Sequence, residues 1–196
     1  MATTRTHERI LDAATRLFAD EGIHATGVDR VIAEAGVAPM TVYRHFAGKD
    51  DLVTATLERW GERWLGWLRH EAWLAGDDPA ARLEALWDAL EKWFADEGFR
   101  GSYAANVAIE LRARPGHPAQ AVVAAHRAAL RELLRDLLTG AGPPPAASVL
   151  QLQMLIDGAV TAAAVDHQPG AAAGARAMAS GLLADQRRTA GTLAGR

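Results

Sequence analysis

A short stretch of the sequence, residues 39–49, carries side chains that could recognise a nucleic acid. It reads PMTVYRHFAGK and brings a phenol, a guanidinium, an imidazole and an ammonium group close together along the chain. These groups hydrogen-bond phosphate oxygens and the edges of bases. No acidic residue occurs between Gly36 and Lys49, so this stretch forms a local positive segment.

The charge of the wider chain argues against indiscriminate binding. Residues 1–50 carry six Lys and Arg against seven Asp and Glu, and the full chain of 196 residues has a net charge of −3. Proteins that bind nucleic acids or membrane surfaces without selectivity are usually basic. We therefore expect modest non-specific affinity for DNA and no interaction with a membrane.

Two helices are expected to precede this segment. Thr6 and Thr26 are suitable N-caps for them, because a threonine hydroxyl can accept a hydrogen bond from a first-turn N–H. Gly22 is expected to end the first helix, and Gly36 to supply the tight turn after the second. This spacing predicts a compact three-helix unit.

The third helix is expected to begin near Pro39, where a missing N–H costs nothing because first-turn donors have no partner within the helix. Val42 and Phe46, four residues apart, are expected to face the core. Lys49, just before the next helix, is placed to meet a phosphate. The outward side of the third helix then carries Pro39, Met40, Thr41, Tyr43, Arg44 and His45.

This layout is typical of a helix-turn-helix, which places its second helix in the major groove of DNA. Through Thr26–Asp29, Ala35–Val37, Thr41–Phe46 and Gly48–Asp50, the region resembles the DNA-binding domain of the tetracycline-repressor (TetR) family of one-component bacterial regulators. Helix-turn-helix shapes also occur in proteins that never bind DNA, which is the alternative interpretation. The resemblance implies DNA contacts at Thr26, Met40, Thr41, Tyr43, His45 and Lys49.

The rest of the chain shows helical periodicity and no convincing strand pattern, so the predicted fold class is all-α. We expect a helix-turn-helix DNA-binding domain over residues 1–50 and a helical effector-binding and dimerisation domain over residues 51–196. Further helices are expected over residues 51–74, 78–97, 102–114, 118–138, 148–166 and 174–193.

Aromatic residues mark the beginning of the second region. All six tryptophans lie between residues 60 and 93, at helical spacing on two successive helices. One interpretation is that they only fill a core, and the other is that some of them line an apolar pocket for a small molecule. In the second interpretation, the pocket residues are Trp64, Trp67, Trp87 and Phe94.

Polar residues on otherwise apolar helices could hold a ligand in such a pocket. Tyr103, Asn106 and Glu110 fall on one helix, and His126 lies on the apolar stripe of the next. Each could instead be a satisfied polar group of the core or a solvated one. For Glu110, the expected partners are His126, a ligand amine or, at the surface, Arg114.

The helix expected over residues 148–166 is apolar nearly all round, which requires burial on every side. For a chain of this size, a second subunit is the easiest source of that burial. The runs FRGSYAANVAIEL, HPAQAVVAAHRAALRELL and LQLQMLIDGAVTAA also resemble the effector-binding domain of one TetR subgroup. The resemblance implies a homodimer formed through the last two major helices.

No pattern in the sequence indicates catalysis. The chain has no cysteine, no His-Glu-x-x-His, no Gly-x-Ser-x-Gly and no phosphate or dinucleotide loop. A metal site built from Glu110, His126 and Asp157 would need a convergence that their spacing does not show. We therefore expect no enzyme activity and no cofactor. Without a signal-peptide pattern or a run of about 20 apolar residues, the expected location is cytoplasmic.

These features predict a ligand-responsive transcriptional regulator, and more specifically a repressor that binds a palindromic operator as a dimer. The expected partners are double-stranded DNA, an apolar or aromatic small-molecule effector and a second copy of the chain. The alternative is a small-molecule binding or sequestering protein whose helix-turn-helix is vestigial.

Overall fold

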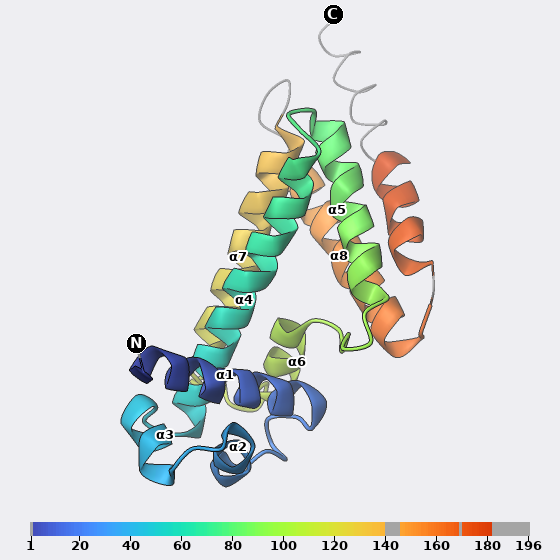
Figure 1. Ribbon diagram of the computed structural model, residues 1–196. Coiled ribbons are helices and arrows are strands. Elements are labelled where there is room, and N and C mark those ends of the chain that lie inside the picture. Colours follow the sequence, from blue (N-terminus) through green and yellow to red (C-terminus); the bar gives the residue numbers. More distant parts are fainter. Residues whose placement is uncertain (1, 140–145, 169, 182–196) are drawn as a thin grey trace, which may run out of the picture. The chain divides into compact units, whose positions relative to one another are not determined.

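The computed structural model in Figure 1 describes residues 2–139, 146–168 and 170–181. Within these ranges every regular element is a helix, which confirms the predicted all-α class. The helices are α1 (Ala2–Asp20), α2 (Val28–Ala35), α3 (Pro39–His45), α4 (Lys49–Leu74), α5 (Pro79–Phe94), α6 (Tyr103–Glu110), α7 (Ala119–Leu138) and α8 (Ala146–Val165). The chain is helical again over residues 171–181, and the expected continuation to residue 193 lies outside the described residues.

The chain divides into two compact units. Unit 1 consists of Met1–Trp64 and Ser102–Ala128, and unit 2 of Leu65–Gly101 and Ala129–Arg196. Helices α1, α2, α3 and α6 belong to unit 1, α5 and α8 belong to unit 2, and α4 and α7 contribute to both. The functional division after residue 50 stays a prediction.

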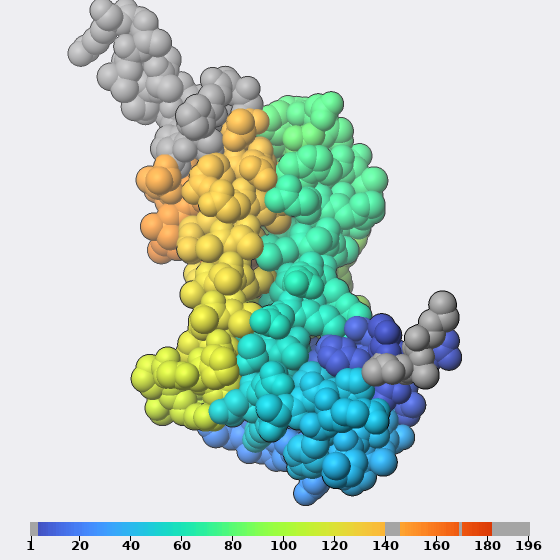
Figure 2. Space-filling model, turned by 90° about the vertical axis from the view of Figure 1, so that its left-hand side faces the viewer, coloured from blue at the N-terminus to red at the C-terminus, as the bar shows by residue number. Residues whose placement is uncertain are grey.

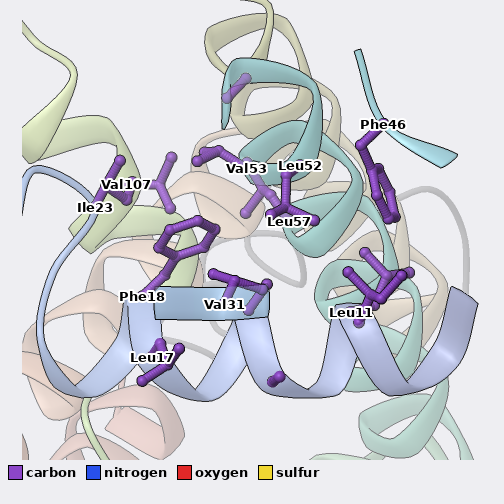
Figure 3. Packing of buried hydrophobic residues seen from close by; sticks show 14 of the residues in the cluster. Leu11, Leu17, Phe18, Ile23, Val31, Phe46, Leu52, Val53, Leu57 and Val107 are labelled. Atoms are coloured by element: carbon purple, nitrogen blue, oxygen red, sulfur yellow. The ribbon is translucent and has the colours of Figure 1, made fainter. Parts of the chain in front are cut away.

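The core of unit 1 combines helices that are far apart in the sequence. Figure 3 shows Phe18 of α1, Val31 of α2, Leu57 of α4 and Val107 of α6 converging on one apolar cluster. Burial of each large apolar side chain contributes about 1.5–3 kcal/mol. The short α6 is therefore packed into the same core as the helix-turn-helix.

Local signals set the limits of α2 and α3. Gly36 adopts the left-handed conformation (φ 61°) and its N–H donates to the carbonyl oxygens of Ala33 and Ile32, as a helix C-cap does. Pro39 occupies the first turn of α3, as predicted. Two N-cap predictions were wrong, because α1 begins before Thr6 and the N-cap of α2 is Gly27.

The caps of α5 and α6 agree with the sequence. Asp78 accepts hydrogen bonds from the N–H groups of Ala80 and Ala81, and Ser102 accepts one from Ala105. Helix α6 ends at Glu110 rather than near Arg114, because the chain then tightens into turns in which the N–H groups of Arg112, Arg114 and His117 bond the carbonyls three residues back.

In unit 2, α5 buries Leu86, Trp87 and Leu90 completely. The helix over residues 171–181 lies beside α5 in Figure 1, and its Arg176 forms an ion pair with Asp88 of α5. Helix α8 is long and apolar enough to cross a membrane by length and composition alone, but a core helix of a soluble protein passes the same test.

Candidate functional site

The outward side of α3 is the strongest candidate for a binding surface in unit 1. Met40 is 78% exposed and Tyr43 51% exposed, and both Pro39 and Arg44 are exposed beside them. Figure 2 shows α3, light blue, at the surface of the face in view. Because α3 buries only Val42, its polar and apolar groups remain available to a partner.

Three anchors fix α3 in this orientation. Val42 and Phe46 insert into the core and are almost fully buried. From α1, the Nη2 atom of Arg9 donates to the carbonyl oxygens of Ala35 and Gly36, at 2.7 and 3.3 Å. The turn between α2 and α3 is thus held by α1 as well as by Gly36.

The acidic residues at the start of α4 are both engaged within unit 1. Asp51 Oδ2 accepts a hydrogen bond from the N–H of Ala47 at 2.8 Å, and Asp50 forms a two-point ion pair with Arg114. The Arg114 hydrogen bond is the largest influence on Asp50 and keeps its pKa below the ordinary value. Lys49 is partly buried and precedes this pair.

A histidine completes the arrangement around Asp50. The Nε2 atom of buried His117 lies 3.2 Å from Asp50 Oδ1. Its Nδ1 accepts a hydrogen bond from the N–H of Ala119 at 3.1 Å, so the ring proton of the neutral tautomer is on Nε2, the nitrogen nearer Asp50. Sequence reasoning missed this group, because His117 and Arg114 are far from Asp50 along the chain.

The side chains of two residues expected to contact DNA, Thr26 and His45, pack against other parts of the protein. Thr26 is 0% exposed, and its hydroxyl donates to the carbonyl oxygen of Gly22 at 2.8 Å. The ring of His45 packs against His7 and Phe46, and its Nε2 atom is buried. The side chain of Thr26 is thus buried in this structure and those of His45 and Thr41 are partly exposed, and the DNA contacts of all three stay predictions.

Three residues assigned to a ligand pocket meet in unit 1. The ring of His126 lies 5.7 Å from that of Trp64, and both contact Trp60, which also contacts Tyr103. Trp60 and Trp64 stack at 5.8 Å. These distances are those of rings in direct contact, so in this structure the cluster is packed.

Glycine and threonine support this aromatic cluster. A Cβ at Gly61 would lie only 3.0 Å from His126 Nδ1, so the absence of a side chain lets the imidazole approach α4. The Thr56 hydroxyl donates to the Val53 carbonyl oxygen, so the hydrogen bond of 2.9 Å between Thr56 and Tyr103 is donated by the tyrosine. Burial raises the pKa of Tyr103 well above its usual range.

The other aromatic candidates belong to unit 2. Trp87 is fully buried on α5, Trp67 is partly buried, and Phe94 packs with Trp93 and Phe99 at the end of α5. The single pocket predicted from the sequence is thus divided between two units, and its ligand contacts stay a prediction. Asn106 lies on α6 in unit 1 and is partly buried.

Glu110 has a partner that was not among those expected. Its carboxylate accepts hydrogen bonds from the backbone N–H and the ring of His24, in the turn between α1 and α2. Arg114 is paired with Asp50 instead. The difference arises because α6 ends at Glu110, so Arg114 no longer follows it by one helical turn.

No group of three His, Asp or Glu residues within the described ranges could hold a metal ion. Glu110 and His126 lie in unit 1, whereas Asp157 lies on α8 in unit 2. The described residues thus offer no metal-binding constellation.

Comparison with known proteins matches both halves of the chain. Residues 10–56 match the model described as bacterial regulatory proteins, tetR family, and residues 77–185 match the tetracyclin repressor-like C-terminal domain. A TetR-family transcriptional regulator from Streptomyces coelicolor, SCO4454, is 33% identical with a TM-score of 0.83, over 93% of this chain and 96% of that one. Reduced NemR from E. coli is 18% identical with a TM-score of 0.79, over 89% and 95%, and supports the fold alone.

Curated relatives match over shorter stretches. The HTH-type transcriptional activator FasR of Mycolicibacterium smegmatis is 33% identical over 86 residues, which are 42% of this chain and 39% of FasR. The HTH-type transcriptional regulator AcrR of Shigella flexneri is 33% identical over 94 residues, 47% of this chain and 43% of AcrR. The chain thus matches less than half the length of these relatives.

Proposed function

Because the chain belongs to the TetR family of bacterial transcriptional regulators, which are non-enzymatic DNA-binding proteins, we propose that it binds a palindromic operator as a homodimer and releases it when a small molecule binds. The observation that carries the proposal is the outward side of α3, with exposed Met40, Tyr43 and Arg44 on a helix that buries only Val42. A helix presented in this way fits the major groove.

The side chains of α3 and Lys49, the first residue of α4, have different roles in this proposal. Tyr43 and Lys49 bind phosphates, which fixes the position of the protein but carries no sequence information. Met40 and Thr41, near the N-terminal end of α3, contact base edges, where a thioether or a methyl group can pack on a thymine methyl. Arg44 adds positive charge on the same helix, and Pro39 contributes only shape.

The exposed side of α8 supports the homodimer. Leu150, Met154 and Val165 are 50%, 62% and 69% exposed, and helical geometry places them on one side of the helix. Exposed apolar residues on one side of a helix are typical of a protein–protein interface, and here Asp157 and Thr161 lie among them. In a dimer with twofold symmetry, two copies of α3 would meet successive major grooves, and the operator would be a palindrome.

The effector in this proposal is a small apolar or aromatic molecule. Two aromatic groups of residues support it, Trp64 with His126 in unit 1 and Trp87 with Phe94 in unit 2. We propose repression, although the similar proteins include both an activator, FasR, and a transcriptional repressor of Mycobacterium tuberculosis, Rv3405c, 43% identical over 63 residues. Cytoplasmic location follows from the same proposal, because the operator is there.

Selection of genomic DNA fragments on the purified protein tests the proposal. We expect enrichment of one palindromic sequence and, in sedimentation, a dimer at micromolar concentration. If no palindrome is enriched while aromatic compounds still quench tryptophan fluorescence, the protein is a small-molecule binding or sequestering protein with a vestigial helix-turn-helix. A monomer at micromolar concentration would contradict both the dimer and the palindrome.

A further inference from the structure

The turn that joins α1 to α2 holds a carboxylate that comes from α6. Glu110 Oε2 lies 3.1 Å from the backbone nitrogen of His24 and 3.2 Å from His24 Nδ1. The N–H of Ile23 also donates to this carboxylate. All three residues belong to unit 1, although Glu110 is 86 positions from His24 along the chain.

Gly22 makes this approach possible in two ways. Its backbone has φ +86°, a conformation that favours glycine, at the position directly before the Ile23 and His24 N–H groups. A Cβ at this position would lie 3.3 Å from Glu110 Oε2, so a side chain would crowd the carboxylate. The turn is thus an anion-binding concavity occupied by the protein's own glutamate.

The electrostatics of the contact agree with the geometry. Burial alone would raise the pKa of Glu110, but the hydrogen bonds donated by Ile23 and His24 outweigh it and lower the pKa below the ordinary value. The carboxylate is therefore ionised at neutral pH, when its hydrogen bonds to the two N–H groups are charge-assisted and strong.

The same turn determines where α2 begins. The Thr26 N–H and hydroxyl both donate to the carbonyl oxygen of Gly22, and Gly27 follows as the N-cap of α2. A change in the turn would therefore displace the first residues of α2. Because α2 leads into α3 through only Gly36, Val37 and Ala38, the displacement would reach the helix proposed to read DNA.

We propose that Glu110 is a positioning residue for DNA reading: it holds the α1–α2 turn in the conformation that orients α2 and α3 toward the operator. The inference rests on the proposed function and extends it. Glu110 lies within residues 77–185, which match the C-terminal family model, yet its carboxylate serves the N-terminal module.

The test uses the full-length protein and the operator selected on it. Glu110→Ala removes the carboxylate, Glu110→Gln keeps its shape and one acceptor but removes the charge, and His24→Ala removes only the ring. Glu132→Gln is the matched control, an exposed glutamate on α7 that pairs with Arg135. Ile156→Val, in the core of unit 2, controls for a general loss of stability.

Two quantities are measured for each variant: hydrogen exchange of the Ile23 and His24 amides in the free protein, and affinity for the operator relative to random DNA. For Glu110→Ala we expect exchange and the operator Kd each to rise about tenfold, for Glu110→Gln about threefold and for His24→Ala about twofold, because charged hydrogen bonds are worth more than neutral ones. Glu132→Gln and Ile156→Val should leave both quantities unchanged within experimental error.

Unchanged exchange of the Ile23 and His24 amides in Glu110→Ala would overturn the proposal. Faster exchange with unchanged operator affinity would also overturn it, because Glu110 would then be merely structural. The proposal fails as well if Ile156→Val weakens operator binding as much as Glu110→Ala. If Glu110→Ala does not fold, Glu110→Gln and His24→Ala decide by the same two measurements. If the unsubstituted protein selects no operator, the proposed function itself is wrong. If it selects an operator and the Glu110 variants bind that operator with unchanged affinity, only the role of Glu110 is wrong.

Discussion

The outward sides of α3 and α8 both expose a methionine, yet their surroundings differ. Met40 on α3 stands beside Tyr43 and Arg44, which carry hydrogen-bonding and cationic groups. Met154 on α8 stands in a stripe with Leu150 and Val165, which carry none. We therefore propose different roles for the two methionines, a base contact for Met40 on α3 and a subunit contact for Met154 on α8.

The two helices also differ in what holds them. Helix α8 is anchored by its own buried side chains, which are Ser148, Val149, Leu152, Gln153, Ile156, Ala159 and Val160. Helix α3 buries only Val42 and depends on neighbours such as Phe46 and Arg9 for its orientation. Substitutions on the exposed sides of both helices should therefore change binding more than stability.

Met154→Glu should have the largest effect, because it places an unpaired carboxylate in the proposed apolar subunit interface. We expect dimer dissociation to increase about 100-fold or more, from the desolvation of that charge. Sedimentation equilibrium measures it, with Ala124→Glu, an exposed position on α7, as the control. A dimer of unchanged strength would show that the α8 stripe is not the interface.

Substitutions on α3 and at Lys49, the first residue of α4, should separate affinity from sequence preference. Tyr43→Phe and Lys49→Ala should weaken binding to all sequences by similar factors, because both residues are assigned to phosphates. Met40→Ala should change the preferred base at one position by about 1–3 kcal/mol. Operator libraries measured by fluorescence anisotropy check both. A changed consensus in Tyr43→Phe, with none in Met40→Ala, would reverse the two roles.

Tyr103→Phe should lower stability and leave binding through the exposed sides of α3 and α8 unchanged. It removes the hydroxyl that donates to Thr56 inside the core of unit 1. We expect a loss of about 1 kcal/mol in the free energy of unfolding, measured with urea. Phe99→Leu, in unit 2, is a control for loss of aromatic surface without a hydrogen bond. Equal or greater stability in Tyr103→Phe would mean that this hydrogen bond adds nothing to the fold.

The smallest expected effect is on the pH dependence of unfolding. In the folded protein the pKa of Glu110 is below its ordinary value of 4.5, so its contact contributes stability above that value. The contribution is lost as pH falls through the lower, folded-state pKa. Urea midpoints between pH 6 and pH 3 should therefore fall less steeply in Glu110→Gln than in the unsubstituted protein. Parallel curves would indicate that the carboxylate gains nothing from the turn.

The sequence predicted the elements whose signals are local. Gly36, Pro39 and the four-residue spacing of Val42 and Phe46 together defined the turn and α3, because a glycine conformation, a missing N–H and helical periodicity act over a few residues. Thr26 was misread because a threonine just before a helix is an N-cap by type, whereas here Gly27 takes that position and the hydroxyl turns inward.

Features that depend on distant partners were not predictable. The pairing of Glu110 with the α1–α2 turn, like that of His45 with His7, joins residues whose proximity only tertiary packing creates. The grouping of the tryptophans also depends on tertiary packing and could not be predicted. Their helical spacing placed them on apolar sides of two helices, but it could not assign Trp64 and Trp87 to different units.

The ion pair between Asp50 and Arg114 has a consequence for how fast the protein finds DNA. Asp50 directly follows Lys49, and an uncompensated carboxylate there would repel the phosphate that Lys49 is proposed to bind. Arg114 cancels that charge at 2.5 Å without occupying α3 or its exposed side. Attraction between unlike charges raises the rate of diffusional encounter more than the lifetime of the complex. The speed of the search would thus depend on an arginine that need not touch the operator.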